Sequence, residues 1–177
     1  MKKLLILLLL PFSSFAQEVT PKPVYTTPET PYYYLRGGTS VGNLGEKQSS
    51  FVLGALGTRR YADEFFYGTE FSTHYGAEEY QTTLININMG YHFLVWKHRI
   101  KPYVAVNFGY GFIKDTTELS RPEGSGVNMG LDFGFDLFSL GLVKTFTGIK
   151  YDHLITNRQE LKSSSFLDLY FGIGIRF

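Results

Sequence analysis

The chain has 177 residues, the length of one domain, and its 17 basic and 16 acidic residues give a net charge of +1. That balance excludes a general electrostatic attraction to nucleic acid. Cysteine is absent, so disulfides, thiolate metal sites and a cysteine nucleophile are excluded as well. The mean hydropathy of −0.08 is that of a water-soluble protein. However, the 16 Phe, 13 Tyr and 19 Gly are typical of an all-β protein whose two sheet faces differ sharply.

Residues 1–16 have the layout of a cleaved secretory signal peptide. Lys2 and Lys3 precede a run of apolar residues at 4–10, and a small-x-small pattern ends at Ala16, before Gln17. Seven apolar residues in a row are far fewer than the roughly 20 that a membrane-spanning helix needs. The sequence therefore predicts export, with cleavage between Ala16 and Gln17.

Residues 17–31 are predicted to form an extended N-terminal tail. They contain four of the seven prolines and no glycine, and proline-rich sequence of this kind does not enter a sheet interior. All 19 glycines lie from Gly37 onward. We therefore expect one folded domain at 32–177.

Within this domain apolar and polar residues alternate with the two-residue period of β-strands. The pattern is clearest in 127–137, where Val, Met, Leu and Phe alternate with Asn, Gly and Asp. In 50–60 either face could be the apolar one, and in 144–155 we expect Ile149 and Tyr151 opposite Lys150 and Asp152. The predicted strands are 32–41, 50–60, 65–75, 82–93, 102–112, 127–137, 144–155 and 167–177. The short connectors between them, at 42–49, 60–64, 76–80, 94–101, 113–124, 138–143 and 156–164, predict an antiparallel meander.

Three features predict that this meander closes into a transmembrane barrel. The strands are mostly 10–12 residues long, the polar face is rich in Gly, Asn and Asp, and aromatic residues gather near strand ends. These aromatic residues are Tyr32–Tyr34, Phe65–Tyr67, Tyr75, Tyr80, Phe93, Trp96, Tyr103 and Phe177. The predicted fold class is all-β, an eight-stranded antiparallel up-and-down transmembrane β-barrel. The alternative is a secreted soluble β-protein such as a lipocalin-like calyx.

Two motifs carry a resemblance to a known family. The ending Tyr170-x-Gly172-x-x-Ile175-x-Phe177 resembles the signal read by the barrel-assembly machinery of Gram-negative outer membranes, although Tyr170 stands where a strongly polar residue is usual. The segments 101–105 and 109–111 (KPYVA and GYG) resemble a strand of small OmpA/OmpX-type eight-stranded barrels. The resemblance covers about 32–177. It implies an outer-membrane location and biogenesis with periplasmic chaperones, but not the peptidoglycan-binding domain of OmpA-type proteins.

The polar faces predict a network of charged side chains inside the barrel. An isolated buried charge is expensive, so these groups must pair with one another or contact water. The predicted members are Arg36, Glu70, His92, Asp132, Asp136, Lys150, Asp152, Asp168 and Arg176, with His74. We interpret them as a structural plug, because eight strands enclose just enough space for their own side chains. A gated path for small ions is the alternative.

The sequence predicts no catalytic site, cofactor or metal centre. None of His74, His92, His98 and His153 has the His-x-Ser spacing of the lipid A deacylases. His153 follows Asp152, but adjacent strand residues point to opposite faces. No zinc or EF-hand spacing is present.

The predicted function is that of a monomeric integral outer-membrane protein with a structural or surface-interaction role. Its expected contacts are membrane lipids and lipopolysaccharide, with a surface partner at the connectors 42–49 and 113–124, which lie outside the cell if the N-terminus is periplasmic. The alternatives are a lipid-A-modifying enzyme and a minimal small-solute channel.

Overall fold

The computed structural model describes residues 30–44, 47–62, 64–76, 80–93, 100–115, 122–140, 142–157 and 163–177. The predicted signal peptide with its cleavage site at Ala16 and Gln17, and almost all of the predicted tail, lie outside these ranges. So do Trp96 and His98. Among the described residues no helix is long and apolar enough to cross a membrane.

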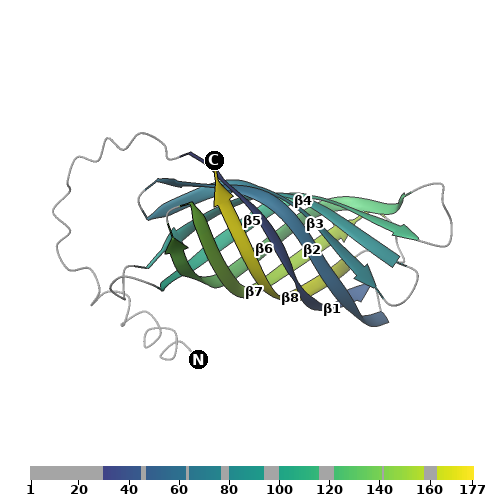
Figure 1. The fold of residues 1–177 in the computed structure, drawn as a ribbon. Helices are drawn as coiled ribbons and strands as arrows, with labels where there is room; N and C mark the ends of the chain where they lie inside the picture. The colour runs from purple at the N-terminus through teal and green to yellow at the C-terminus, as the bar shows by residue number, and fades with distance from the viewer. Residues whose placement is uncertain are drawn as a thin grey trace, which may run out of the picture.

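Eight strands form one closed antiparallel barrel in which each strand pairs with its sequence neighbours and β8 pairs with β1 (Figure 1). The strands are β1 (Tyr32–Leu44), β2 (Lys47–Ala62), β3 (Phe65–Gly76), β4 (Tyr80–His92), β5 (Lys101–Asp115), β6 (Pro122–Leu140), β7 (Val143–Thr156) and β8 (Ser163–Arg176). The predicted all-β, up-and-down barrel of eight strands is confirmed.

The strands are longer than predicted, with 12 to 19 residues each. The connector predicted at 42–49 is therefore wrong, because β1 and β2 stay paired as far as Leu44 and Lys47. Backbone pairing depends on main-chain groups and continues through polar residues, where hydrophobic alternation gives no signal. The predicted connector at 113–124 shortens in the same way to the segment between Asp115 and Pro122.

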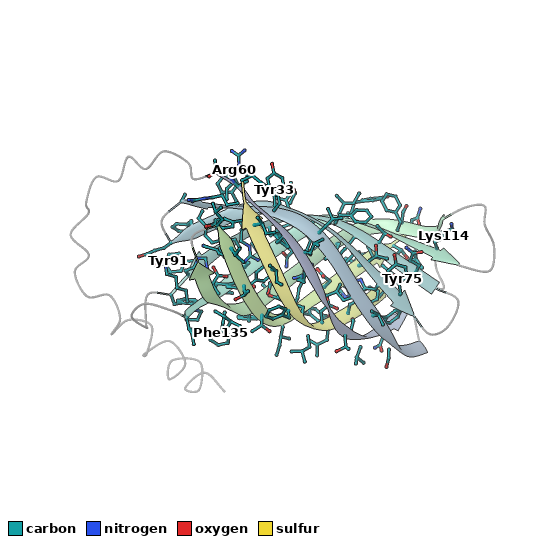
Figure 2. All side chains as sticks on the ribbon, in the orientation of Figure 1. Tyr33, Arg60, Tyr75, Tyr91, Lys114 and Phe135 are labelled. Atoms are coloured by element: carbon teal, nitrogen blue, oxygen red, sulfur yellow. The ribbon has the colours of Figure 1, made fainter. Side chains whose placement is uncertain are left out.

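Alternation places the large apolar side chains on the outside of the barrel and the polar ones inside. Leu167, Leu169, Phe171, Ile173 and Ile175 of β8 are exposed, and the residues between them are buried. The ambiguous strand β2 turns Phe51, Leu53, Ala55, Arg59 and Tyr61 inward. All eight strands therefore present an apolar outer face (Figure 2).

The aromatic residues that the sequence places near strand ends divide between the outer and inner faces of the barrel. Tyr33, Phe65, Tyr67, Tyr75, Phe93 and Phe177 are exposed, whereas Tyr32, Tyr34, Phe66 and Tyr103 are buried inside. The cause is strand parity, because consecutive residues such as Phe65 and Phe66 must point to opposite faces.

The interior also contains apolar layers near both ends of the barrel. Phe51, Leu84, Ile113, Leu154 and Phe166 form one cluster near the turns that follow β1, β3, β5 and β7. Tyr32, Tyr61, Phe66, Tyr103 and Ala105 form another where β1 begins. Apolar side chains therefore pack inside the barrel towards each end, and the charged residues lie between and beside them.

Inward glycines make room for the interior rings. A methyl group added at Gly90 would collide with the ring of Phe66, and one added at Gly57 would lie 2.6 Å from the ring of Tyr34. By contrast, no atom lies within 4 Å of a Cβ added at Gly54. Glycine at positions 57 and 90 is thus required by packing.

We expect Gly90→Ala to lower the free energy of unfolding by about 1–3 kcal/mol, because Phe66 must leave its position. The measurement is the urea midpoint of the barrel folded in detergent micelles. The matched control, Gly54→Ala, is expected to be neutral or slightly stabilising. Equal losses in the two variants would contradict the packing argument.

Candidate functional site

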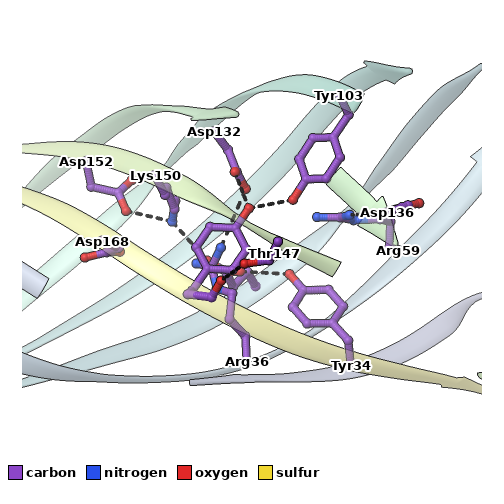
Figure 3. Close-up of polar contacts among 12 residues, drawn as sticks. Tyr34, Arg36, Arg59, Tyr103, Asp132, Asp136, Thr147, Lys150, Asp152 and Asp168 are labelled. Carbon is purple, nitrogen blue, oxygen red and sulfur yellow. Dashed lines mark hydrogen bonds and ion pairs between the residues drawn. The ribbon is translucent and has the colours of Figure 1, made fainter. Parts of the chain in front are cut away.

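The interior network is centred on Glu70 of β3, which lies between a cation from β1 and one from β7. Figure 3 shows these two cations, Arg36 and Lys150. Its Oε1 atom lies 2.6 Å from Arg36 Nη2 and 2.9 Å from Lys150 Nζ. Tyr34 donates its hydroxyl hydrogen to Oε2 at 2.9 Å. Arg36, Glu70 and Lys150 are all buried. Through these contacts the carboxylate of Glu70 links β3 to β1 and β7 inside the barrel.

Arg36 also connects Glu70 to a second carboxylate. Its Nη1 lies 3.6 Å from Asp132 Oδ2, and its guanidinium stacks 4.3 Å above the ring of Tyr170. Tyr170 donates a hydrogen bond to Asp132, and its hydroxyl oxygen lies 2.5 Å from that of Tyr103. Tyrosine hydroxyls thus extend the ion pairs across the barrel.

Lys150 continues the network towards the end at which Phe51 and Phe166 pack. It lies 2.7 Å from Asp152, which also accepts a hydrogen bond of 2.9 Å from the amide of Asn128. Beyond it, His74 Nε2 lies 3.0 Å from Asp168.

A separate cluster surrounds Asp136 where β1 begins and β2 ends. Asp136 lies 3.0 Å from His92 Nε2, 3.7 Å from Arg59 and 3.8 Å from Lys144. Tyr61 donates to it at 3.3 Å. The Arg59 guanidinium also packs 4.3 to 5.6 Å from the rings of Phe66, Tyr103, Phe146 and Tyr34.

Of the nine residues predicted for the network, eight are buried inside the barrel, and His74 is buried with them. Arg176 is only half-buried and lies at the end of β8, 5.6 Å from the ring of Tyr32. Sequence reasoning missed Arg59, because the inward face of 50–60 was ambiguous. It also missed Lys144 and the tyrosines that link the carboxylates, although strand parity marks Tyr34 and Tyr170 as inward.

This arrangement neutralises charge inside a narrow protein cylinder. Each of the carboxylates Glu70, Asp132, Asp136, Asp152 and Asp168 lies within 4 Å of a basic side chain. Charges taken out of water are tolerated when they are paired and hydrogen-bonded in this way. Within the described ranges, no three His or carboxylate side chains gather as a metal site would require.

The motif that resembles an assembly signal lies on both faces of β8. Tyr170 is in the interior network, and Gly172 lies beneath the ring of Phe146. Ile175 and Phe177 are exposed on the outside.

Outside the barrel, the structure brings together a histidine and a serine that are distant in sequence. His153 Nδ1 lies 2.9 Å from Ser165 Oγ across β7 and β8, and Tyr151 donates to the same serine at 3.2 Å. Asp152 is buried on the opposite face from His153, as strand parity predicts.

Comparison with solved structures identifies the architecture. The chain aligns with Neisserial surface protein A (NspA) at a TM-score of 0.76 and 11% identity, over 86% of this chain and 100% of that one. The chain has the fold of the eight-stranded outer-membrane barrels. The N-terminal barrel domain of Pseudomonas aeruginosa OprF aligns at a TM-score of 0.56 and 12% identity, over 85% of this chain and 100% of that one.

A third solved structure, the outer membrane enzyme PagL, aligns at a TM-score of 0.53 and 11% identity, over 80% of this chain and 97% of that one. No protein-family model matches the chain, and no curated protein matches it either. Identities this low establish the barrel fold alone.

We expect Glu70→Gln to lower the free energy of unfolding by about 3–5 kcal/mol, because Arg36 and Lys150 would then face each other without their shared carboxylate. The measurement is urea unfolding of the protein folded into phospholipid vesicles. The double variant Glu70→Gln, Lys150→Met should lose less than the sum of the losses in the two single variants, since each single substitution already breaks the Glu70–Lys150 contact. Additive losses from the two substitutions would contradict a coupled network.

Proposed function

We propose that this chain is an integral outer-membrane β-barrel protein with a structural or surface-interaction role and a side-chain-filled interior. The observation that carries the proposal is the apolar outer face present on all eight strands around a charged interior. Water would not stabilise an exposed hydrophobic surface that surrounds the whole molecule, whereas lipid does.

The height of the apolar face fits a bilayer. The exposed apolar positions run from Leu167 of β8 to Phe177, the residue that follows this strand. Ten steps of about 3.3 Å, inclined at about 40°, rise about 25 Å, which is the height of the apolar band of outer-membrane barrels.

Several observations support a Gram-negative outer membrane as the location. The solved structures with this fold include outer membrane proteins, and the sequence begins with a predicted export signal. With both ends of the barrel domain on the periplasmic side, the turns after β1, β3, β5 and β7 face the cell exterior. Lipopolysaccharide would then contact this half, and a surface partner would meet the tip of the β1–β2 hairpin and the connector between β5 and β6. Membrane insertion would require periplasmic chaperones and the barrel-assembly machinery.

The packed interior supports a structural role over a channel. Glu70 contacts both Arg36 and Lys150 in the middle, and apolar clusters lie towards both ends. Apolar layers of this kind oppose the passage of hydrated ions, because taking a charge out of water is costly.

We therefore expect no discrete conductance steps when the purified protein is inserted into planar bilayers. Substituting Phe51 and Phe166 together by Ser should open the interior apolar cluster that contains these two rings, without adding a charge. Regular single-channel steps in the wild-type protein would contradict the proposal and favour the channel.

One contact favours the enzymatic alternative. His153 and Ser165 form a base–hydroxyl pair on the outer face, where a lipid ester could reach it. We give this candidate second place because the acidic neighbour of His153, Asp152, lies on the other side of the sheet and cannot orient the imidazole. Covalent labelling of Ser165 by a fluorophosphonate probe, lost in Ser165→Ala, would favour the enzyme.

The membrane proposal predicts that the protein expressed in a Gram-negative host will fractionate with outer membranes and resist extraction by urea. The folded barrel should also migrate differently on gels before and after boiling, since its closed hydrogen-bonded wall survives detergent. Recovery as a soluble periplasmic or secreted protein would contradict the proposal.

A further inference from the structure

A groove of about 830 Å³ opens on the outer face of the barrel where β1, β2 and β8 meet. Its walls are apolar side chains from the three strands, namely Tyr33, Leu35, Leu56, Phe171, Ile173 and Ile175. The rings of Tyr33 and Phe177 lie 6.0 Å apart at the end near the chain termini. The groove is part of the surface for which we propose contact with lipid.

The far end of the groove is formed by an outward-facing glycine. Gly37 of β1 pairs with Phe171 on one side and with Gly54 of β2 on the other. A Cβ added at Gly37 would meet its nearest atom at 3.8 Å, and one added at Gly54 would meet none within 4 Å. Unlike Gly90, these glycines make room for no part of the chain itself, although glycine weakens a strand. The space that they leave is open only to a molecule outside the barrel.

The length of the groove fits one acyl chain in one leaflet. From Tyr33 to Gly37 the strand rises four steps of about 3.3 Å, or about 13 Å in total. At a tilt of about 40° this covers about 10 Å of the roughly 15 Å that separate the edge of the hydrocarbon core from its midplane. If the groove were empty, the side chains on its two walls would have no atoms to contact across it and would lose dispersion energy. An acyl chain that fills the groove restores these contacts.

A cation lies beyond the end of the groove. Thr58 pairs with Tyr33, and Arg60 follows on the same outer face, two residues nearer the end of the barrel. Arg60 is exposed, and Figure 2 shows it at the same end of the barrel as Tyr33. No carboxylate among the described residues forms an ion pair with it. A guanidinium at the edge of an apolar surface is suited to a phosphate group through paired, charge-assisted hydrogen bonds.

We propose that this groove, named here the β1–β2–β8 groove, binds one glycerophospholipid of the leaflet on the side of the chain termini. One acyl chain lies between Leu35, Leu56 and Phe171 and ends at Gly37, and the phosphate contacts Arg60. The proposal rests on the membrane location proposed above. A second copy of this chain would be a different occupant, and it would have to place an anionic group against Arg60.

The test is native mass spectrometry of the folded protein, released from detergent micelles that contain palmitoyl-oleoyl-phosphatidylethanolamine. The wild-type protein should retain one lipid at collision energies that remove the detergent. Gly37→Leu, which fills the groove, and Arg60→Gln, which removes the cation, should each lower the retained fraction at least five-fold. Thr83→Leu adds similar bulk to the outer face of β4, and Lys101→Gln removes a cation at the same end of the barrel, so both should retain the lipid.

Equal lipid retention in all five proteins would overturn the proposal, as would a wild-type dimer that Gly37→Leu dissociates. The change in gel mobility on boiling is recorded for each variant, so that loss of lipid is scored only in folded barrels. A wild-type protein without this mobility change would contradict the membrane barrel itself, which separates the two failures.

Discussion

The constraint on which the structure depends is that eight strands enclose a space too narrow for bulk water. Charged groups turned inward must therefore be paired within the protein. Glu70 meets this constraint by accepting from Arg36, Lys150 and Tyr34 at once. The partners come from β1 and β7, on either side of β8, so the network ties the closing strands to β3 across the interior.

The same constraint accounts for the distribution of glycine and aromatic residues. Interior rings lie over the glycines that pair with them on the adjacent strand, as Phe146 of β7 does over Gly172 of β8. Larger residues at these glycine positions would displace the interior rings. These rings include Phe146, which packs against the guanidinium of Arg59. Gly37 and Gly54 face outward and belong to a different pattern, in which the missing side chains shape the surface offered to lipid.

Strand parity made the barrel and most of its interior predictable. Where apolar and polar residues alternate without interruption, as in β6 and β8, the inward residues follow directly, and Asp132 and Asp168 are buried as their positions indicated. In β2 both faces contain apolar and polar residues, so alternation does not show which face points inward. Arg59 was missed for this reason. The pairing of Glu70 with Lys150, and of His153 with Ser165, depends on register and on distance across the barrel. A single sequence contains neither.

The central claim is that the barrel has its polar residues inside and its apolar residues towards lipid. Because the chain has no cysteine, a spin label can be placed singly at successive positions from 85 to 89 of β4 in the protein folded into phospholipid vesicles. Labels at Ile85, Ile87 and Met89 should collide readily with oxygen dissolved in the bilayer and rarely with a water-soluble nickel chelate. Labels at Asn86 and Asn88 should be protected from both. High accessibility to the nickel chelate at Ile85, Ile87 and Met89 would contradict the account.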